Sequence, residues 1–286
     1  MRILLTGRTG QVGSALARTL APLGELRAFD RNGLDLRDTS SIRTRIRQVK
    51  PDIIVNAAAY TAVDRAEQEE DSAFEVNFKA VKELAQEAKA IDALLIHFST
   101  DYVFDGEKAL PYVETDVPNP LNVYGRSKLE GERAIAASGC RHFIFRTSWV
   151  YAPAGRNFLR TILAAARSKP ELRVVDDQRG APTSSDAIAV ALARILAAPD
   201  SMQKPGGIYH LSAAGETTWC EFARAILQDA GLNTPVVPIP SDQFPTAAKR
   251  PKNSLLDNAK LQREFAITLA DWRQGLREVS SKIGSH

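Results

Sequence analysis

The chain has 286 residues, 44% of them hydrophobic and 25% charged, which is typical of a globular protein with one large domain or a main domain and a smaller lobe. Its net charge of +3, with no segment dominated by Lys and Arg, argues against nucleic acid or a membrane as a partner. Two cysteines without a CxxC spacing and four scattered histidines argue against a disulfide framework and a metal site. The opening MRILLTG is too short for a signal peptide or a membrane span, so we expect a reduced, cytoplasmic protein.

Five short apolar runs alternate with longer amphipathic segments in the first half of the chain. The runs are continuous, as in parallel strands covered on both faces, and lie at 2–5, 26–29, 52–55, 93–98 and 142–147. Helices are expected between them at about 11–22, 39–49, 71–91 and 120–138. This alternation predicts an α/β fold with a Rossmann-type, doubly wound parallel sheet.

The pattern becomes less regular after about residue 150, where prolines and polar turns are frequent. The Pro-rich stretch 234–253 is expected to form loops with short strands. Helical patterns return at about 156–168, 184–197, 217–230 and 269–283. We therefore divide the chain into a main domain over 1–150 and a smaller C-terminal lobe over 151–286, with some segments of the lobe returning to the main sheet.

Three glycines directly follow the first predicted strand and open the first helix. Gly7, Gly10 and Gly13 are spaced GxxGxxG rather than GxGxxG, but the physical requirement is shared. Glycines permit a tight turn and let the backbone approach a pyrophosphate, while the helix N-terminus offers unpaired N–H groups to the anion. A glycine turn without a ligand is the alternative; the flanking strand and helix favour a dinucleotide.

The second predicted strand ends at residues that bear on the choice between NADH and NADPH. Asp30 lies 17 residues after Gly13, near the offset of a ribose-binding acid, and favours NADH. Arg31 favours the 2′-phosphate of NADPH, with an exposed turn residue as the alternative. Asp35 and Leu36 are expected against the adenine. The small residues that follow the third strand would let a cofactor lie against the backbone, or would serve helix–sheet packing alone.

Ser99, Thr100 and Asp101 end the fourth predicted strand, at the sheet edge where open α/β sheets bind their ligands. A hydroxyl there can hydrogen-bond a substrate carbonyl and stabilise the negative charge that grows on it during hydride attack. A turn that satisfies only its own backbone is the alternative.

The fourth predicted helix has Asn119 as a candidate cap and Pro120 at its first position. Tyr124 and Lys128 share one face of it at i, i+4. In a ketone reductase, Tyr124 would donate a proton to the developing alkoxide, while Lys128 would lower the pKa of the tyrosine and hold the nicotinamide ribose. The alternative is a solvated helix face on which Lys128 pairs with Glu132, also at i, i+4.

Together these motifs resemble the extended short-chain dehydrogenase/reductase superfamily and, within it, the dTDP-4-dehydrorhamnose reductase family. The resemblance spans nearly the whole chain. The segments that carry it are TGRTGQVG (6–13), DLRD (35–38), NAAAYTAVDRAE (56–67), STDYVFDGE (99–107), PLNVYGRSKLEGE (120–132), FRTSWVYA (145–152), DDQRGAPT (176–183) and KRPKNSLLD (249–257).

The resemblance implies that residues 1–150 bind NAD(P) and that the C-terminal lobe binds the substrate. It implies a catalytic trio of Thr100, Tyr124 and Lys128. The motifs and the resemblance together mark as cofactor contacts Gly7, Gly10, Gln11, Val12, Gly13, Asp30, Arg31, Asp35, Leu36, Ala59, Tyr60, Thr61, Tyr124 and Lys128. Contacts to the sugar nucleotide are expected at Thr100, Asp101, Trp149 and Arg250. The implied reaction is hydride transfer from NADPH or NADH to C4 of dTDP-4-dehydro-L-rhamnose, giving dTDP-L-rhamnose for cell-envelope polysaccharide.

Two of these substrate contacts also have plain alternatives. Trp149 suits the face of a sugar ring, but a core tryptophan is as good an interpretation of the sequence. Lys249 and Arg250 lie in a polar, Pro-rich loop where a cation suits the substrate diphosphate, with a solvated loop charge as the alternative.

Some members of the family bind magnesium through carboxylates, one of them on the first helix. Here that helix opens Gly13-Ser14-Ala15-Leu16 without an acid, so magnesium is not expected, although a homodimer without a shared metal is allowed. Two other functions stay open, a 4-epimerase or dehydratase on the same scaffold and a non-catalytic nucleotide-binding regulatory subunit. A dehydratase would need further acid–base groups beside Thr100, and the intact trio argues against a non-catalytic protein.

Overall fold

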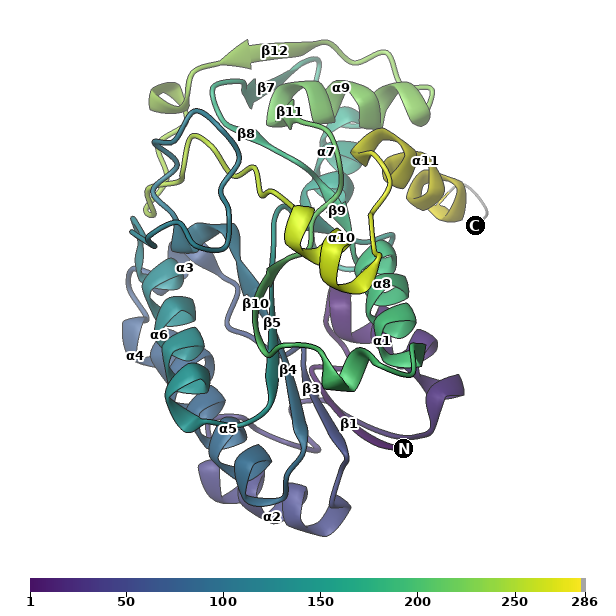
Figure 1. The fold of residues 1–286 in the computed structure, drawn as a ribbon. Helices are drawn as coiled ribbons and strands as arrows, with labels where there is room; N and C mark the ends of the chain where they lie inside the picture. The colour runs from purple at the N-terminus through teal and green to yellow at the C-terminus, as the bar shows by residue number, and fades with distance from the viewer. Residues whose placement is uncertain (284–286) are drawn as a thin grey trace.

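A six-stranded parallel sheet forms the centre of the computed structural model, which describes residues 1–283 (Figure 1). The strands, in spatial order, are β10 (Gly207–His210), β5 (His142–Thr147), β4 (Leu94–Thr100), β3 (Ile53–Asn56), β1 (Arg2–Thr6) and β2 (Glu25–Phe29). All neighbouring pairs in this sheet are parallel. The predicted Rossmann-type fold is therefore confirmed, and each predicted strand lies within two residues of an observed one.

Helices cover both faces of the main sheet, which explains why its central strands are mostly apolar and buried. Ile3 and Leu5 of β1 pack on the face covered by α1 (Gln11–Leu20) and α8 (Ser185–Ala197), whereas Leu4 faces the opposite side. The helices on that opposite side are α2 (Thr39–Val49), α5 (Ala80–Ala90) and α6 (Val123–Ser138). The helix predicted at 71–91 is observed as α4 (Glu70–Phe74), a π-helical segment (Glu75–Lys79) and α5.

The strand order reverses at β1, which lies between β2 and β3. Such a reversal opens a crevice at the carboxyl ends of the central strands, where doubly wound folds bind nucleotides. Gly7 follows β1 and lies against the backbone of Ala57 and Ala58, which follow β3. The glycine turn is therefore placed at the reversal point.

The C-terminal lobe has a core of its own, built from short strand pairs and three helices. Its core contains Phe222, Trp272 and Leu276 among other apolar side chains. The helices are α7 (Phe158–Ala166), α9 (Trp219–Asp229) and α11 (Trp272–Ile283). The strand pairs are β7 (Leu172–Val175) with β12 (Val236–Ile239), β8 (Arg179–Gly180) with β11 (Thr217–Thr218), and β6 (Val150–Tyr151) with β9 (Thr183–Ser184).

Several short elements were not predicted from the sequence. They are α3 (Val63–Ala66), α10 (Ala259–Phe265), the strand β10, and 3-10 turns at Ala21–Leu23, Asp101–Val103, Ser201–Gln203 and Ser241–Gln243. Within residues 1–283, no helix is long and apolar enough to cross a membrane.

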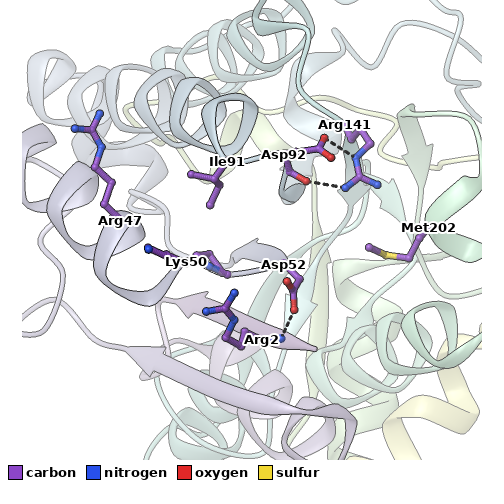
Figure 2. A pocket seen from close by; sticks show the side chains of 9 residues that line it. Arg2, Arg47, Lys50, Asp52, Ile91, Asp92, Arg141 and Met202 are labelled. Atoms are coloured by element: carbon purple, nitrogen blue, oxygen red, sulfur yellow. Dashed lines mark hydrogen bonds and ion pairs between the residues drawn. The ribbon is translucent and has the colours of Figure 1, made fainter.

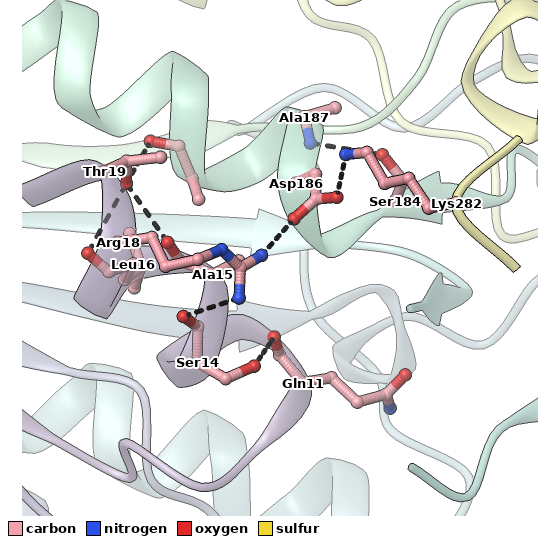
Figure 3. Close-up of polar contacts among 11 residues, drawn as sticks. Gln11, Ser14, Ala15, Leu16, Arg18, Thr19, Ser184, Asp186, Ala187 and Lys282 are labelled. Carbon is pink, nitrogen blue, oxygen red and sulfur yellow. Dashed lines mark hydrogen bonds and ion pairs between the residues drawn. The ribbon is translucent and has the colours of Figure 1, made fainter. Parts of the chain in front are cut away.

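Polar contacts join the main domain to segments from the second half of the chain (Figure 3). Asp186, in the first turn of α8, accepts hydrogen bonds from Arg18 Nη2 of α1 at 2.8 Å and from Lys282 Nζ of α11 at 2.6 Å. Thr19 Oγ1 of α1 donates to the carbonyl oxygen of Ala189 at 3.3 Å. Both α8 and β10 come after residue 150 in the sequence, yet α8 covers the main sheet and β10 is one of its strands. The division of the chain into two domains at residue 150 stays a prediction.

The predicted start of α6 is wrong. Asn122, not Asn119, is the N-cap, and its Oδ1 accepts the hydrogen bond from the Gly125 backbone N at 2.8 Å. Asn119 instead donates its Nδ2 to Asp105 Oδ2 at 3.1 Å. Either asparagine could cap the helix by its local chemistry, and the contact of Asn119 with Asp105 distinguishes the two.

Candidate active site

The glycine turn is shaped for close backbone contacts. Gly7 has φ +72°, and a Cβ atom there would lie 2.7 Å from the Ala58 backbone N. A Cβ atom on Gly13 would lie 2.0 Å from the Gly7 carbonyl oxygen. Gly10 is the N-cap of α1 without a side-chain cap, and Gln11 Oε1 is buried without a hydrogen-bond partner in the described structure. The bare helix start and the unpaired amide oxygen fit a bound dinucleotide.

The residues predicted for the adenosine end lie in the turn after β2. Asp30 Oδ1 accepts hydrogen bonds from the backbone N of Asn32 and Gly33 at 3.1 and 3.0 Å, which closes the turn. Arg31 is exposed, and its Nε lies 3.6 Å from Asp35 Oδ2. Hydrogen bonds from Arg37 hold the pKa of Asp35 below its usual value. The side chain of Leu36, in contrast, is buried in the apolar core.

The loop after β3 is fixed by an asparagine that the sequence analysis missed. Asn77 Oδ1 accepts from the Tyr60 backbone N at 2.9 Å, and Asn77 Nδ2 donates to the Tyr60 carbonyl and to Ser127 Oγ, both at 3.0 Å. Asn77 lies in the π-helical segment and thereby joins this loop to α6. Ala59 is half-buried and Thr61 exposed. The feature of the sequence that could have identified Asn77 is a polar residue on an otherwise buried helix face.

The predicted catalytic trio comes together where α6 begins beside the end of β4. Thr100 is the last residue of β4; its hydroxyl donates to Asp101 Oδ1 at 3.1 Å and acts on Tyr124 of α6, whose pKa it lowers in part. Lys128, one turn later, donates its Nζ to the carbonyl oxygen of Phe98 on the same strand at 2.6 Å. A Cβ atom on Gly125 would lie 2.2 Å from the Tyr102 carbonyl oxygen, so only glycine allows the helix to pack this closely.

Lys128 and Glu132 do not form the surface ion pair that was the alternative. Lys128 is 1% exposed and Glu132 is 3% exposed. The Glu132 carboxylate accepts hydrogen bonds from Arg146 Nε at 2.9 Å and Nη2 at 2.6 Å. Arg146 belongs to β5, so Glu132 ties α6 to the sheet and leaves Lys128 to the site.

Burial dominates the pKa of Tyr124 in this structure, and the predicted lowering of that pKa by Lys128 stays a prediction. Burial raises the pKa of Tyr124 to about 12, and the hydrogen bond with Thr100 offsets the rise only in part. Burial lowers the pKa of Lys128 to about 8, and the charge of Glu132 opposes that change. The phenol proton is therefore held on Tyr124, as a proton donor requires.

Asp101 follows Thr100 and is buried at the carboxyl end of the sheet. Burial raises its pKa to about 6, while hydrogen bonding from Ser254 and Thr100 lowers it in part. Ser254 was not predicted as a site residue, although it lies in the segment 249–257 that carries part of the family resemblance.

Trp149 does not offer a free ring face to a sugar. It has φ +49° and stacks on Trp219, with ring centroids 3.6 Å apart and planes 9° apart. A Cβ atom on Gly180 would lie 2.4 Å from the Trp149 ring. Trp149 is 9% exposed, as in the core alternative, whereas the unpredicted Trp219 is half-buried.

Arg250 is not a solvated loop charge. Its Nη1 and Nη2 donate to the Asp64 carboxylate at 3.1 and 2.7 Å. The next residue back, Lys249, is exposed, and its carbonyl oxygen accepts from Asn122 Nδ2 at 2.8 Å. The Pro-rich loop of the lobe is therefore tied to the start of α6 and to Asp64 in the main domain.

Comparisons with known proteins agree with these features. Residues 1–284 match the family model described as the RmlD substrate binding domain. A dTDP-4-dehydrorhamnose reductase of Escherichia coli K12 is 43% identical over 294 residues, covering 99% of this chain and 98% of its own length. The chain belongs to the dTDP-4-dehydrorhamnose reductase family.

Two further members support this assignment. A Burkholderia thailandensis dTDP-4-dehydrorhamnose reductase is 46% identical over 285 residues, covering 96% of each chain. The crystal structure of the Bacillus anthracis dTDP-4-dehydrorhamnose reductase in complex with NADP is 34% identical. It superimposes with a TM-score of 0.93 over 98% of this chain and 99% of its own.

In the present protein, a pocket of about 380 Å³ lies at the edge of the main sheet opposite to the one that carries the glycine turn (Figure 2). Its lining includes Arg2, Asp52, Asp92 and Arg141, each of which lies at or just before the start of a main-sheet strand. Arg141 Nη2 donates to the Asp92 carbonyl at 2.7 Å, and the Arg2 backbone N donates to Asp52 at 2.6 Å. Ligands of doubly wound sheets bind at the carboxyl ends of the strands, so this pocket is not the nucleotide site.

Residues 1–283 of the present protein contain no group of three or more His, Cys, Asp or Glu side chains that could bind a metal ion. At the first helix, Ser14 Oγ donates to the Gln11 carbonyl at 3.1 Å (Figure 3). The nearby carboxylate, Asp186, is paired with Arg18 and Lys282.

Proposed function

We propose that the protein reduces the C4 ketone of dTDP-4-dehydro-L-rhamnose to dTDP-L-rhamnose, with NADPH or NADH as the reductant. The observation that supports this most is the convergence of Thr100, Tyr124 and Lys128 at the end of β4, on the sheet edge that also carries the glycine turn. The reductase names of the relatives support the same reaction.

The cofactor would lie across the carboxyl edge of the main sheet. Gly10, Gln11 and Val12 would hold the pyrophosphate with the N–H groups that open α1. Asp30 would accept from the adenosine ribose, and the exposed Arg31 would meet a 2′-phosphate. The NADP bound by the Bacillus anthracis relative favours NADPH.

The proposed chemistry divides among three side chains. A bound nicotinamide cofactor supplies the hydride that adds to C4. Thr100 orients the ketone oxygen by a hydrogen bond, and Tyr124 gives its phenol proton to that oxygen, so that the C=O becomes CH–OH. Lys128 holds the nicotinamide ribose and stabilises the tyrosinate left behind.

The lobe would recognise the sugar nucleotide. Asp101, with Ser254 beside it, suits the sugar hydroxyls. Arg250 suits the diphosphate, provided that it shares or leaves Asp64, to which it is now paired. Trp149 would contact the sugar with its ring edge, since Trp219 and Gly180 cover its ring.

The deciding experiment is a coupled assay with dTDP-4-dehydro-L-rhamnose and each cofactor in turn. We expect cofactor absorbance at 340 nm to fall only when the keto sugar nucleotide is present. Unchanged absorbance with authentic substrate would contradict the reductase. An epimerase would instead purify with tightly held NAD and consume none, and a regulatory subunit would bind cofactor without turnover.

We infer a cytoplasmic location, which the buried and free state of Cys140 and Cys220 supports. The homodimer stays a prediction, which light scattering of the purified protein would test.

A further inference from the structure

A chain of buried polar side chains continues from Lys128 across three strands of the main sheet. Lys128 Nζ lies 3.0 Å from His97 Nε2, and His97 Nδ1 lies 3.0 Å from Asn56 Nδ2. Thr6 Oγ1 donates to Asn56 Oδ1 at 2.6 Å. All four side chains are at most 1% exposed, and they come from three neighbouring strands and from α6.

The orientation of the Asn56 amide decides which His97 nitrogen carries the proton. Asn56 Oδ1 accepts from Thr6 Oγ1 and from the Ala58 backbone N, the latter at 3.3 Å. Turning the amide over would place its NH₂ group against the Ala58 N–H, two donors facing each other. Asn56 Nδ2 therefore donates to His97 Nδ1, and the neutral imidazole carries its hydrogen on Nε2.

This tautomer conflicts with an ammonium group at Lys128. His97 Nε2–H is a donor, and an ammonium has three donors and no lone pair to accept a hydrogen bond. A neutral amine has that lone pair, while it still donates to the Phe98 carbonyl at 2.6 Å. The geometry therefore favours the neutral amine of Lys128.

The surroundings of Lys128 offer little to offset this preference. His97 on β4 is held neutral, because burial and then the Lys128 charge keep its pKa well below the usual value. Glu132, one turn later on α6, is the carboxylate that acts on Lys128, but it is already paired with Arg146 of β5. Tyr124, one turn earlier, keeps its proton.

We propose that His97 is a positioning residue that favours the neutral amine of Lys128 in the free enzyme, so that binding of the nicotinamide cofactor at mildly alkaline pH takes up a proton at Lys128. The ribose hydroxyls of the cofactor offer acceptors to the ammonium, which then turns away from His97. The proposal rests on the proposed function, because it requires Lys128 to contact that ribose.

The direct test is titration calorimetry of NADPH binding at pH 8.5 in buffers of different ionisation enthalpy, which counts the protons taken up. Since the pKa of Lys128 is about 8, we expect more than half a proton per site. NADPH affinity should fall as pH rises above 8, because the bound form holds the proton. NADH lacks the 2′-phosphate and should give the same count.

Two variants of His97 distinguish the effect of its hydrogen bond to Lys128 from the effect of its side-chain volume. In His97→Gln, the amide can accept from Asn56 and donate to Lys128, so proton uptake should match the wild type. In His97→Leu, Lys128 loses the donor that favours its amine form, so uptake should fall by at least half. Unchanged or increased uptake in His97→Leu would overturn the proposal.

Nitrogen NMR of the wild-type histidines reads the tautomer of His97 directly, and the folded His97→Gln variant serves to assign its signals. His97, assigned by the loss of its signals in His97→Gln, should carry its hydrogen on Nε2, and a hydrogen on Nδ1 would overturn the proposal. Wild-type enzyme that binds NADPH without proton uptake would contradict this inference alone. Failure to bind either cofactor would contradict the proposed function instead.

Discussion

The main domain and the C-terminal lobe are held together in different ways. In the main domain, a continuous parallel sheet is buried on both faces, and most strands pair with neighbours that are close in the sequence. The lobe relies on two- and four-residue strands paired over long distances, such as Leu172–Val175 with Val236–Ile239. The rigid part carries the reacting groups, whereas the lobe places recognition groups on loops, as is common among enzymes.

The largest effect is expected from Tyr124→Phe in the main domain. Removing the phenol proton should lower turnover by about 10²–10⁴-fold and leave the Kd for NADPH nearly unchanged. The control is Tyr151→Phe in the lobe, whose hydroxyl has no hydrogen-bond partner within the described residues and which should keep its activity. Retention of most activity in Tyr124→Phe would exclude Tyr124 as the donor.

The next effect concerns the buried ion pair that anchors the catalytic helix. Glu132→Gln leaves Arg146 charged and uncompensated in the interior, so we expect the free energy of unfolding to fall by about 3–5 kcal/mol. Glu130→Gln, on the same helix, breaks an exposed pair with Arg133 and should cost less than about 1 kcal/mol. Urea unfolding measures both, and equal losses would contradict the distinction.

A change in the lobe should alter substrate binding alone. Gly180→Ala places a methyl group against the Trp149 ring and forces the stacked pair with Trp219 to move. We expect KM for the sugar nucleotide to rise about tenfold, at an unchanged Kd for NADPH. Gly275→Ala, where the new Cβ would make an ordinary 3.4 Å contact, is the control. A larger loss of NADPH binding would show that the two regions are not separable in this way.

The smallest effect is expected at the polar contacts between the regions. Arg18→Ala removes an ion pair whose arginine is 63% exposed, and Lys282 stays on Asp186. Thermal unfolding should show a loss of less than about 1 kcal/mol. A loss above about 2 kcal/mol would mean that this pair, rather than apolar packing, joins α1 to the C-terminal half.

The comparison also explains which features were predictable. The strands and the glycine turn were found because continuous apolar runs and glycine spacing are local patterns. The start of α6 was misplaced because Asn119 and Asn122 are equivalent in local chemistry, and a contact with Asp105 distinguishes them. His97 carried a visible sign, a histidine inside an apolar strand, but the residues that it contacts lie far away in the sequence.

The sequence by itself determined the Rossmann-type sheet and the position of the glycine turn, because each follows from short-range pattern, whereas the candidate trio was implied by the family resemblance of its motifs. Only the tertiary structure decided that Glu132 pairs with Arg146 and that Lys128 contacts His97. The physical reason is burial. Once both α6 side chains leave water, each needs a partner, and the neighbouring strands that the fold brings beside the helix supply it.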